Sequence, residues 1–206
     1  MTWNLDTEEI NSCSLEIVGN IQEESLATYC FIHDQWNGSS AVDNKLFQFV
    51  FRSFYRLDNA GLTDEFKNKY FELLEAVRNK EVNIKSVCET LYEIENRKGS
   101  KSLQFSFATK LANTVNPLLP IYDSEVAKMY GYKPPLTYKP LSERIENLLK
   151  FYKYLSDDYT KVLHDGSIEM TLNTFDKKFP KYQDKISNFK KLDFIVWSAG
   201  KLHTSP

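Results

Sequence analysis

The sequence has few of the residues on which disulfide-rich, metal-binding and turn-rich folds depend. Its three cysteines, Cys13, Cys30 and Cys88, are odd in number and widely spaced, and no Cys-x-x-Cys pair occurs. This spacing argues against a disulfide framework and against a zinc or iron–sulfur site with cysteine ligands. Only 7 glycines and 7 prolines are present among 206 residues, which disfavours a turn-rich all-β fold.

A strong net charge and a long apolar run are also missing. The formal net charge is -2, so no overall positive field draws the protein to nucleic acid or to a membrane, although a local basic face would suffice for nucleic acid. No apolar run approaches the ~18 residues that a membrane-spanning helix needs, and the N-terminal sequence MTWNLDTEEINS does not have the pattern of a secretory signal. We therefore expect a soluble cytoplasmic protein with reduced cysteines and no membrane partner.

Histidine is scarce as well, and its distribution does not predict a metal site. The three histidines, His33, His164 and His203, show no ligand spacing. Nucleophile motifs built on serine or cysteine are not found either. We therefore expect no metal and no other cofactor.

Apolar and aromatic residues, by contrast, are abundant and are spaced as in helices. Hydrophobic residues make up 42% of the chain, with 14 Phe, 12 Tyr and 3 Trp, which is enough for one domain or for two lobes that share a core. Apolar residues recur three and four positions apart through most of the sequence. This spacing predicts helices within 40–57, 62–80, 83–98, 103–115, 141–163 and 186–201, and a short helix with turns in 167–185.

The predicted fold class is therefore all-α, with residues 1–206 forming a single helical domain. Two lobes, 1–98 and 99–206, are expected within it. The segment 133–142 holds three prolines in ten residues and is the expected internal boundary or crossover. Thr63 and Ser142 are expected to cap the helices that follow them.

The stretch QFSFATKLANTVNPLLPIYDSEV, Gln104–Val126, combines one lysine with one aspartate. Lys110 lies at the edge of an apolar helical face that covers an arc of roughly 200°, so its ammonium group is partly desolvated. Desolvation lowers the pKa of an ammonium group and so favours the neutral amine that a nucleophile needs.

Asn116 and Pro117 end this helix, because the residue before a proline is disfavoured in the α region. Asp123 is placed as the N-cap of the next helix, where backbone N–H groups hold its carboxylate. A neutral lysine and a fixed carboxylate across a small gap suit carbonyl or C1′ chemistry, in which the lysine attacks and the aspartate stabilises positive charge or moves a proton. On spacing alone, a lysine that extends to water and an aspartate that only caps a helix remain the alternative.

The sequence FSFATKLANTVNPLLPIYDSEV resembles the lysine–aspartate segment of the helix-hairpin-helix DNA glycosylase superfamily, and most resembles its bacterial 8-oxoguanine DNA glycosylase-like members. The specific similarity covers Ser100–Tyr130, about a seventh of the chain. The resemblance implies that Lys110 is the Schiff-base lysine and Asp123 the catalytic aspartate. It also implies an all-α fold of two helical lobes with the site in the cleft between them.

The hairpin that precedes the lysine helix departs from the family pattern. The typical hairpin binds a DNA phosphate through the backbone amides of a Gly-x-Gly turn, whereas RKGSKSLQF has only Gly99. The predicted phosphate contacts lie at the start of the lysine helix, where free N–H groups are expected. They are Gly99, Ser100, Lys101 and Ser102, together with Lys98, and the basic segments KKFPKYQDK and NFKKL are expected to add contacts to the DNA backbone.

An enzyme of this family must also extrude a nucleotide and hold its base against aromatic surfaces. The candidates are Trp36, Phe107, Tyr122 and Trp197, although large aromatic residues are more often part of the core than of a pocket. The leading hypothesis is a DNA glycosylase, with or without AP lyase activity, that acts on a damaged or modified base in DNA. The alternatives are a non-catalytic DNA-binding module with the same fold and a helical protein–protein adaptor.

Overall fold

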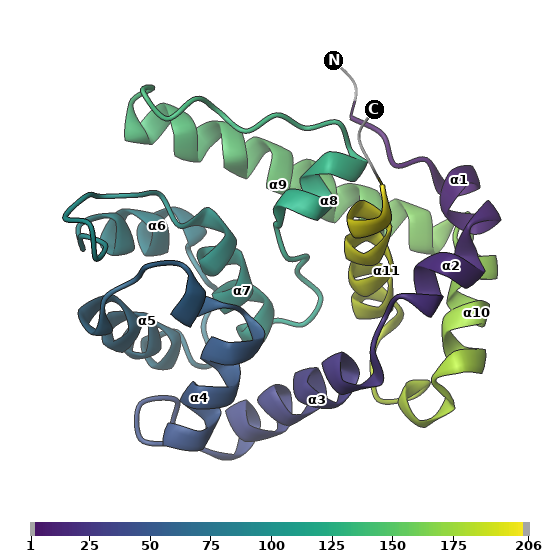
Figure 1. Ribbon diagram of the computed structural model, residues 1–206, viewed down its shortest axis with the longest axis horizontal. Helices are drawn as coiled ribbons and strands as arrows, with labels where there is room; N and C mark the ends of the chain where they lie inside the picture. The colour runs from purple at the N-terminus through teal and green to yellow at the C-terminus, as the bar shows by residue number, and fades with distance from the viewer. Residues whose placement is uncertain (1–2, 204–206) are drawn as a thin grey trace. The chain divides into compact units, whose positions relative to one another are not determined.

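The computed structural model describes residues 3–203, and all regular structure in that range is helical, as predicted (Figure 1). Contacts divide the chain into two units. The terminal unit comprises Met1–Leu26 and Pro117–Pro206, and the middle unit comprises Ala27–Asn116. The α-helices are α1 (Thr7–Ser12), α2 (Ser14–Gly19), α3 (Glu23–Gly38), α4 (Lys45–Phe54), α5 (Asp64–Ala76), α6 (Ile84–Tyr92), α7 (Phe105–Val115), α8 (Ser124–Met129), α9 (Leu141–His164), α10 (Glu169–Lys178) and α11 (Asn188–Leu202), with short 3₁₀ helices at Leu57–Asn59 and Pro180–Tyr182.

Side-chain caps define where helices of the middle unit begin. The Thr63 hydroxyl accepts a hydrogen bond from the N–H of Phe66 at 3.3 Å, so the predicted cap of α5 is confirmed. Asn44 does the same for α4, accepting from the N–H of Phe47 at 2.9 Å. Each cap satisfies a backbone donor that the first helical turn leaves open.

The core of the middle unit is mostly aromatic. Phe51 of α4 packs against Tyr70 and Phe71 of α5, with ring centroids 5.6 Å apart in both pairs. Tyr70 is fully buried, and burial raises the pKa of its hydroxyl well above the usual value. That hydroxyl donates to the Phe107 carbonyl at 3.0 Å. The bond joins α5 to α7, the helix that carries Lys110.

In the terminal unit, the N-terminal helices α1 and α2 pack against helices that are distant in sequence. The Asn11 side-chain amide of α1 donates to the Ser167 carbonyl, just before α10, at 2.8 Å. The buried Ser198 hydroxyl of α11 donates to the Ile17 carbonyl of α2 at 2.7 Å. Contacts of this kind join the two ends of the chain in one unit.

The observed division differs from the lobes 1–98 and 99–206 expected from the sequence. The terminal unit is discontinuous, and the divisions lie between Leu26 and Ala27, inside α3, and between Asn116 and Pro117. A local pattern in the sequence cannot indicate a unit whose two parts are separated by 90 residues of another unit. The proline-rich connector 133–142 lies within the terminal unit.

The N-cap of the long helix α9 lies two residues before the position expected. Pro140 stands at the N-cap and Leu141 is the first helical residue, so the capping role predicted for Ser142 is wrong. Proline suits the start of a helix, because its φ is fixed near the helical value and it has no N–H that needs a partner.

Helices α8 and α11 lie side by side in the terminal unit and approach closely at Gly200 (Figure 1). A Cβ atom built on Gly200 would lie 2.3 Å from the Glu125 carbonyl oxygen, so only glycine allows this approach. The Lys128 Nζ of α8 donates to the Gly200 carbonyl at 2.9 Å and to the Glu125 carboxylate at 2.6 Å. Helix α11 ends at Leu202, close to the end of the predicted range 186–201.

Replacing Gly200 with alanine should destabilise the protein by about 1–3 kcal/mol, because the added methyl group must displace the backbone of α8. Gly19 is a matched control, since no atom lies within 4 Å of a Cβ built there. Gly19→Ala should change the free energy of unfolding by less than about 1 kcal/mol. Urea unfolding followed by circular dichroism measures both effects, and equal effects would contradict the close contact at Gly200.

Candidate functional site

Lys110 projects from α7 of the middle unit into aromatic surroundings. Its side chain is half-buried, and Nζ lies 4.9 Å from the ring centroid of Phe107 and 5.8 Å from that of Tyr55. Nζ also donates to the Tyr55 carbonyl at 3.5 Å. Tyr55 is the C-cap of α4, and a cation is stabilised at the carbonyl end of a helix. A hydrogen bond of this length is weak.

Asp123 is the N-cap of α8, as predicted. Its Oδ1 accepts from the N–H of Glu125 at 3.0 Å, and the Ser124 hydroxyl lies 3.5 Å from the same oxygen. The other carboxylate oxygen, Oδ2, has no hydrogen-bond partner within residues 3–203. The side chain is half-buried. One oxygen is therefore fixed by the helix and the other is available for a second contact.

Lys110 belongs to the middle unit and Asp123 to the terminal unit. The segment from Asn116 to Tyr122 joins them in sequence and contains no helix. Sequence reasoning therefore predicted the helix that carries the lysine and the cap that holds the aspartate. The pairing of the two side chains stays a prediction.

Trp36 is a structural residue of the middle unit. It is 6% exposed, and the Arg78 guanidinium carbon lies 3.7 Å from its ring centroid. Arg78 also donates to the carbonyls of Trp36 and Ser39 and pairs with the Glu75 carboxylate at 2.8 Å. One face of the indole is thus covered by a cation that is held by two carbonyls and one carboxylate, which leaves that face closed to a base.

The other aromatic candidates differ in accessibility. Phe107 is 7% exposed and lies against Lys110. Tyr122 is 8% exposed and packs edge-on against Tyr132, and burial is the main cause that raises the pKa of its hydroxyl. Trp197 of α11 is only half-buried. Phe107 is thus the candidate that the structure brings next to Lys110, and Trp197 is the most open of the four.

The backbone amides of the loop before α7 form hydrogen bonds within the loop. Asn96 Oδ1 accepts from the N–H of Lys98 at 2.9 Å and from that of Ser100 at 3.3 Å, and the Gly99 N–H donates to the Asn96 carbonyl at 2.9 Å. Gly99 adopts φ +70°, which favours glycine. These amides are therefore engaged inside the loop. Asn96 was missed by sequence reasoning, although Asn followed by Gly within a few residues is a turn signal.

The side chains predicted for phosphate binding also have partners in the loop region. Lys101 Nζ lies 2.6 Å from the Glu93 carboxylate, and this hydrogen bond is the main cause that raises the pKa of Lys101. The Ser102 hydroxyl accepts from the Gln104 side-chain amide at 2.8 Å. Lys101 is exposed, so its ion pair is easily exchanged for a phosphate in solution.

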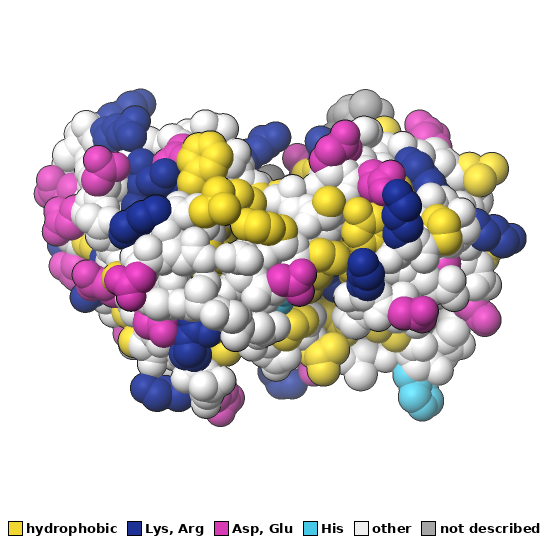
Figure 2. All heavy atoms as spheres, turned by 90° about the horizontal axis from the view of Figure 1, so that it is seen from below, with side chains coloured by type: hydrophobic (Ala, Val, Ile, Leu, Met, Phe, Trp, Pro, Cys, Tyr) yellow, Lys and Arg dark blue, Asp and Glu magenta, His cyan; other side chains and the backbone are white. Residues whose placement is uncertain are grey.

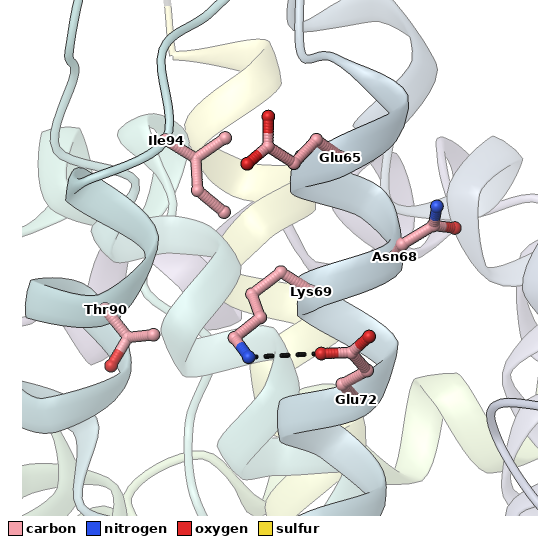
Figure 3. Close-up of a pocket in the computed structure, with 6 residues that line it drawn as sticks. All are labelled: Glu65, Asn68, Lys69, Glu72, Thr90 and Ile94. Atoms are coloured by element: carbon pink, nitrogen blue, oxygen red, sulfur yellow. Dashed lines mark hydrogen bonds and ion pairs between the residues drawn. The ribbon is translucent and has the colours of Figure 1, made fainter.

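A second feature of the middle unit is an open groove of about 620 Å³ between α5 and α6 (Figure 3). Lys69 Nζ bonds the Glu72 carboxylate at 3.1 Å on one wall, while Glu65 and Ile94 face each other across the groove. One wall of this groove could have been predicted from the sequence. Its α5 residues, Glu65, Asn68, Lys69 and Glu72, are spaced three and four positions apart and therefore share one face of the helix. The groove is lined by Glu65, Asn68, Lys69, Glu72, Thr90 and Ile94.

The chain was compared with known proteins, and no family model, curated protein or solved structure matches it. Within residues 3–203, no cluster of three or more histidine, cysteine, aspartate or glutamate side chains is placed to hold a metal ion. No helix in the same range combines the length and hydropathy needed to cross a membrane. The comparisons therefore show no family for this chain.

Proposed function

We propose that the protein is a DNA glycosylase, with or without AP lyase activity, that acts on a damaged or modified base. The observation that carries the proposal is the position of Lys110, whose amine lies beside the rings of Phe107 and Tyr55. The Lys110 side chain is half-buried, and this partial removal from water, unlike the ring contacts, favours the neutral nucleophile. Asp123 supports the proposal, because its cap fixes one oxygen and leaves Oδ2 for a second contact.

In the proposed reaction, the neutral Lys110 amine attacks C1′ of the target nucleotide. The bond from C1′ to the base breaks, and its electron pair leaves with the base. The nitrogen then loses a proton to Asp123, the C1′–O4′ bond breaks with its electron pair on O4′, and O4′ takes up that proton, which leaves an iminium between Lys110 and C1′. Asp123 stabilises the positive charge that develops on the sugar and accepts the proton from the amine.

DNA is the proposed partner, and the loop before α7 would contact it through side chains rather than through amides. The amides of Lys98, Gly99 and Ser100 are already bonded to Asn96. Lys98 and Lys101 are exposed and able to meet a phosphate. On the face drawn in Figure 2, lysine and arginine side chains alternate with acidic ones. Binding made of a few such contacts should be weak and sensitive to salt.

A helical adaptor is the second candidate function, and one observation favours it. Leu46 and Phe49 lie on the outer side of α4, and each is 59% exposed. Large apolar side chains that are exposed together are typical of surfaces that bind other proteins. This candidate predicts a stable protein partner and no covalent adduct with DNA.

Lys110→Ala should abolish covalent trapping of the protein on DNA by borohydride, because the trapped link is the amine that forms when borohydride reduces the iminium between the lysine and C1′. The substrates are duplexes with oxidised, deaminated or abasic sites, and denaturing gels measure the adduct. Lys69→Ala is the matched control, because Lys69 is a lysine of the same unit that lies in the α5–α6 groove. This variant should trap DNA as the wild-type protein does.

The absence of an adduct with the wild-type protein on every duplex would contradict the proposal. An adduct that survives Lys110→Ala would assign the nucleophile to another amine. Salt-sensitive DNA binding that Lys110→Ala leaves unchanged, without any adduct, would favour the non-catalytic DNA-binding module.

Asp123→Asn should slow base excision about a hundredfold while leaving stability nearly unchanged, because asparagine caps a helix as well as aspartate does but carries no charge. Trapping on a preformed abasic site should be retained, since that substrate has already lost its base. Single-turnover strand cleavage after alkali measures base excision, and thermal unfolding checks the cap. An unchanged excision rate would contradict the role given to Asp123.

A further inference from the structure

A single buried peptide group in the terminal unit is bound from two sides. The Pro120 carbonyl accepts from the Tyr152 hydroxyl at 2.9 Å, and the Ile121 N–H of the same peptide donates to Asp193 Oδ1 at 3.1 Å. Tyr152 belongs to α9 and Asp193 to α11. Pro120 and Ile121 are buried, so neither group of this peptide can rely on water. Side chains from two helices therefore fix the plane of the peptide.

Asp193 is itself held by a buried ion pair. Its Oδ2 lies 2.5 Å from Lys190 Nζ, one turn earlier on α11, and the two residues are 5% and 2% exposed. Burial of either charge alone would be strongly disfavoured, so the two side chains depend on each other in the interior. A charged acceptor makes a stronger hydrogen bond to the Ile121 N–H than a neutral one.

The bound peptide lies just before Asp123 in the sequence. Pro120, Ile121 and Tyr122 form no helix or strand, so hydrogen bonds within regular structure do not fix the path of the chain here. On the other side of Asp123, α8 is bonded to the Gly200 carbonyl of α11 through Lys128. Asp123 therefore stands between two points of attachment, and both attachments use α11.

We propose that Asp193 is a positioning residue that places the Asp123 carboxylate through the Pro120–Ile121 peptide. The effect of Asp193 on catalysis rests on the proposed function. Asp193 touches no reacting atom in this role. A misplacement of about 1 Å can cost about a hundredfold in rate, so anchoring of this peptide has a measurable effect.

A pair of double variants isolates the hydrogen bond from the ion pair. Lys190→Met with Asp193→Asn removes both charges but keeps an oxygen that accepts from the Ile121 N–H. Lys190→Met with Asp193→Leu removes both charges and the acceptor. Because both variants lose the same ion pair, they differ in the anchor of the Ile121 amide alone. Thermal unfolding confirms that both remain folded.

Hydrogen exchange of the Ile121 amide and single-turnover base excision are measured on both full-length variants. In the leucine variant, the Ile121 amide should exchange at least about tenfold faster than in the asparagine variant. Base excision by the leucine variant should be at least about tenfold slower. The DNA concentration for half-saturation should be equal in the two variants. Trapping on a preformed abasic site, which does not need Asp123, should be retained in both.

Equal exchange in the two variants would overturn the inference, because the peptide would then not depend on Asp193. Faster exchange with equal excision rates would also overturn it, since the bond would then have a structural role only. If the wild-type protein forms no adduct with DNA, the proposed function fails, and hydrogen exchange alone decides whether Asp193 anchors the peptide.

Discussion

The approach of α8 to α11 at Gly200 is the contact on which the arrangement around Asp123 depends. No side chain fits between Gly200 and the Glu125 carbonyl, so the two helices can be this close only at a glycine. Asp193 lies seven residues earlier on α11, two turns away and on the same face. One face of α11 therefore binds the chain before Asp123 through Asp193 and the helix after it through Gly200. The catalytic role proposed for Asp123 depends on this double attachment.

In the middle unit, Lys110 is subject to opposing influences. The Tyr55 carbonyl at the end of α4 and the faces of nearby rings both favour the ammonium form. Partial burial favours the neutral amine. The hydrogen bond to the Tyr55 carbonyl is long at 3.5 Å and is therefore weak. In the proposed reaction, the substrate displaces these partners before the amine attacks C1′.

Much of the local structure could be predicted from the sequence, because helix periodicity and capping depend on neighbouring residues. The caps at Thr63 and Asp123 were predicted for this reason. The cap at Ser142 was wrong because Pro140 starts α9 without a side-chain acceptor. The discontinuous terminal unit and the Asp193 anchor could not be predicted, since Asp193 and Ile121 are 72 residues apart and nothing in a local pattern connects them. The turn at Asn96 could be predicted from the nearby glycine. The sequence does not reveal, however, that Asn96 accepts hydrogen bonds from the loop amides that were expected to bind phosphate.

The central claim is that the Lys110 amine forms a covalent bond with C1′ of a nucleotide. The most direct measurement is mass spectrometry of the wild-type protein after borohydride reduction on an abasic duplex, followed by protease and nuclease digestion. The deoxyribose mass should be found on the peptide containing Lys110. Its presence on another lysine or on the terminal amine, or on no peptide at all, would show that Lys110 is not the nucleophile.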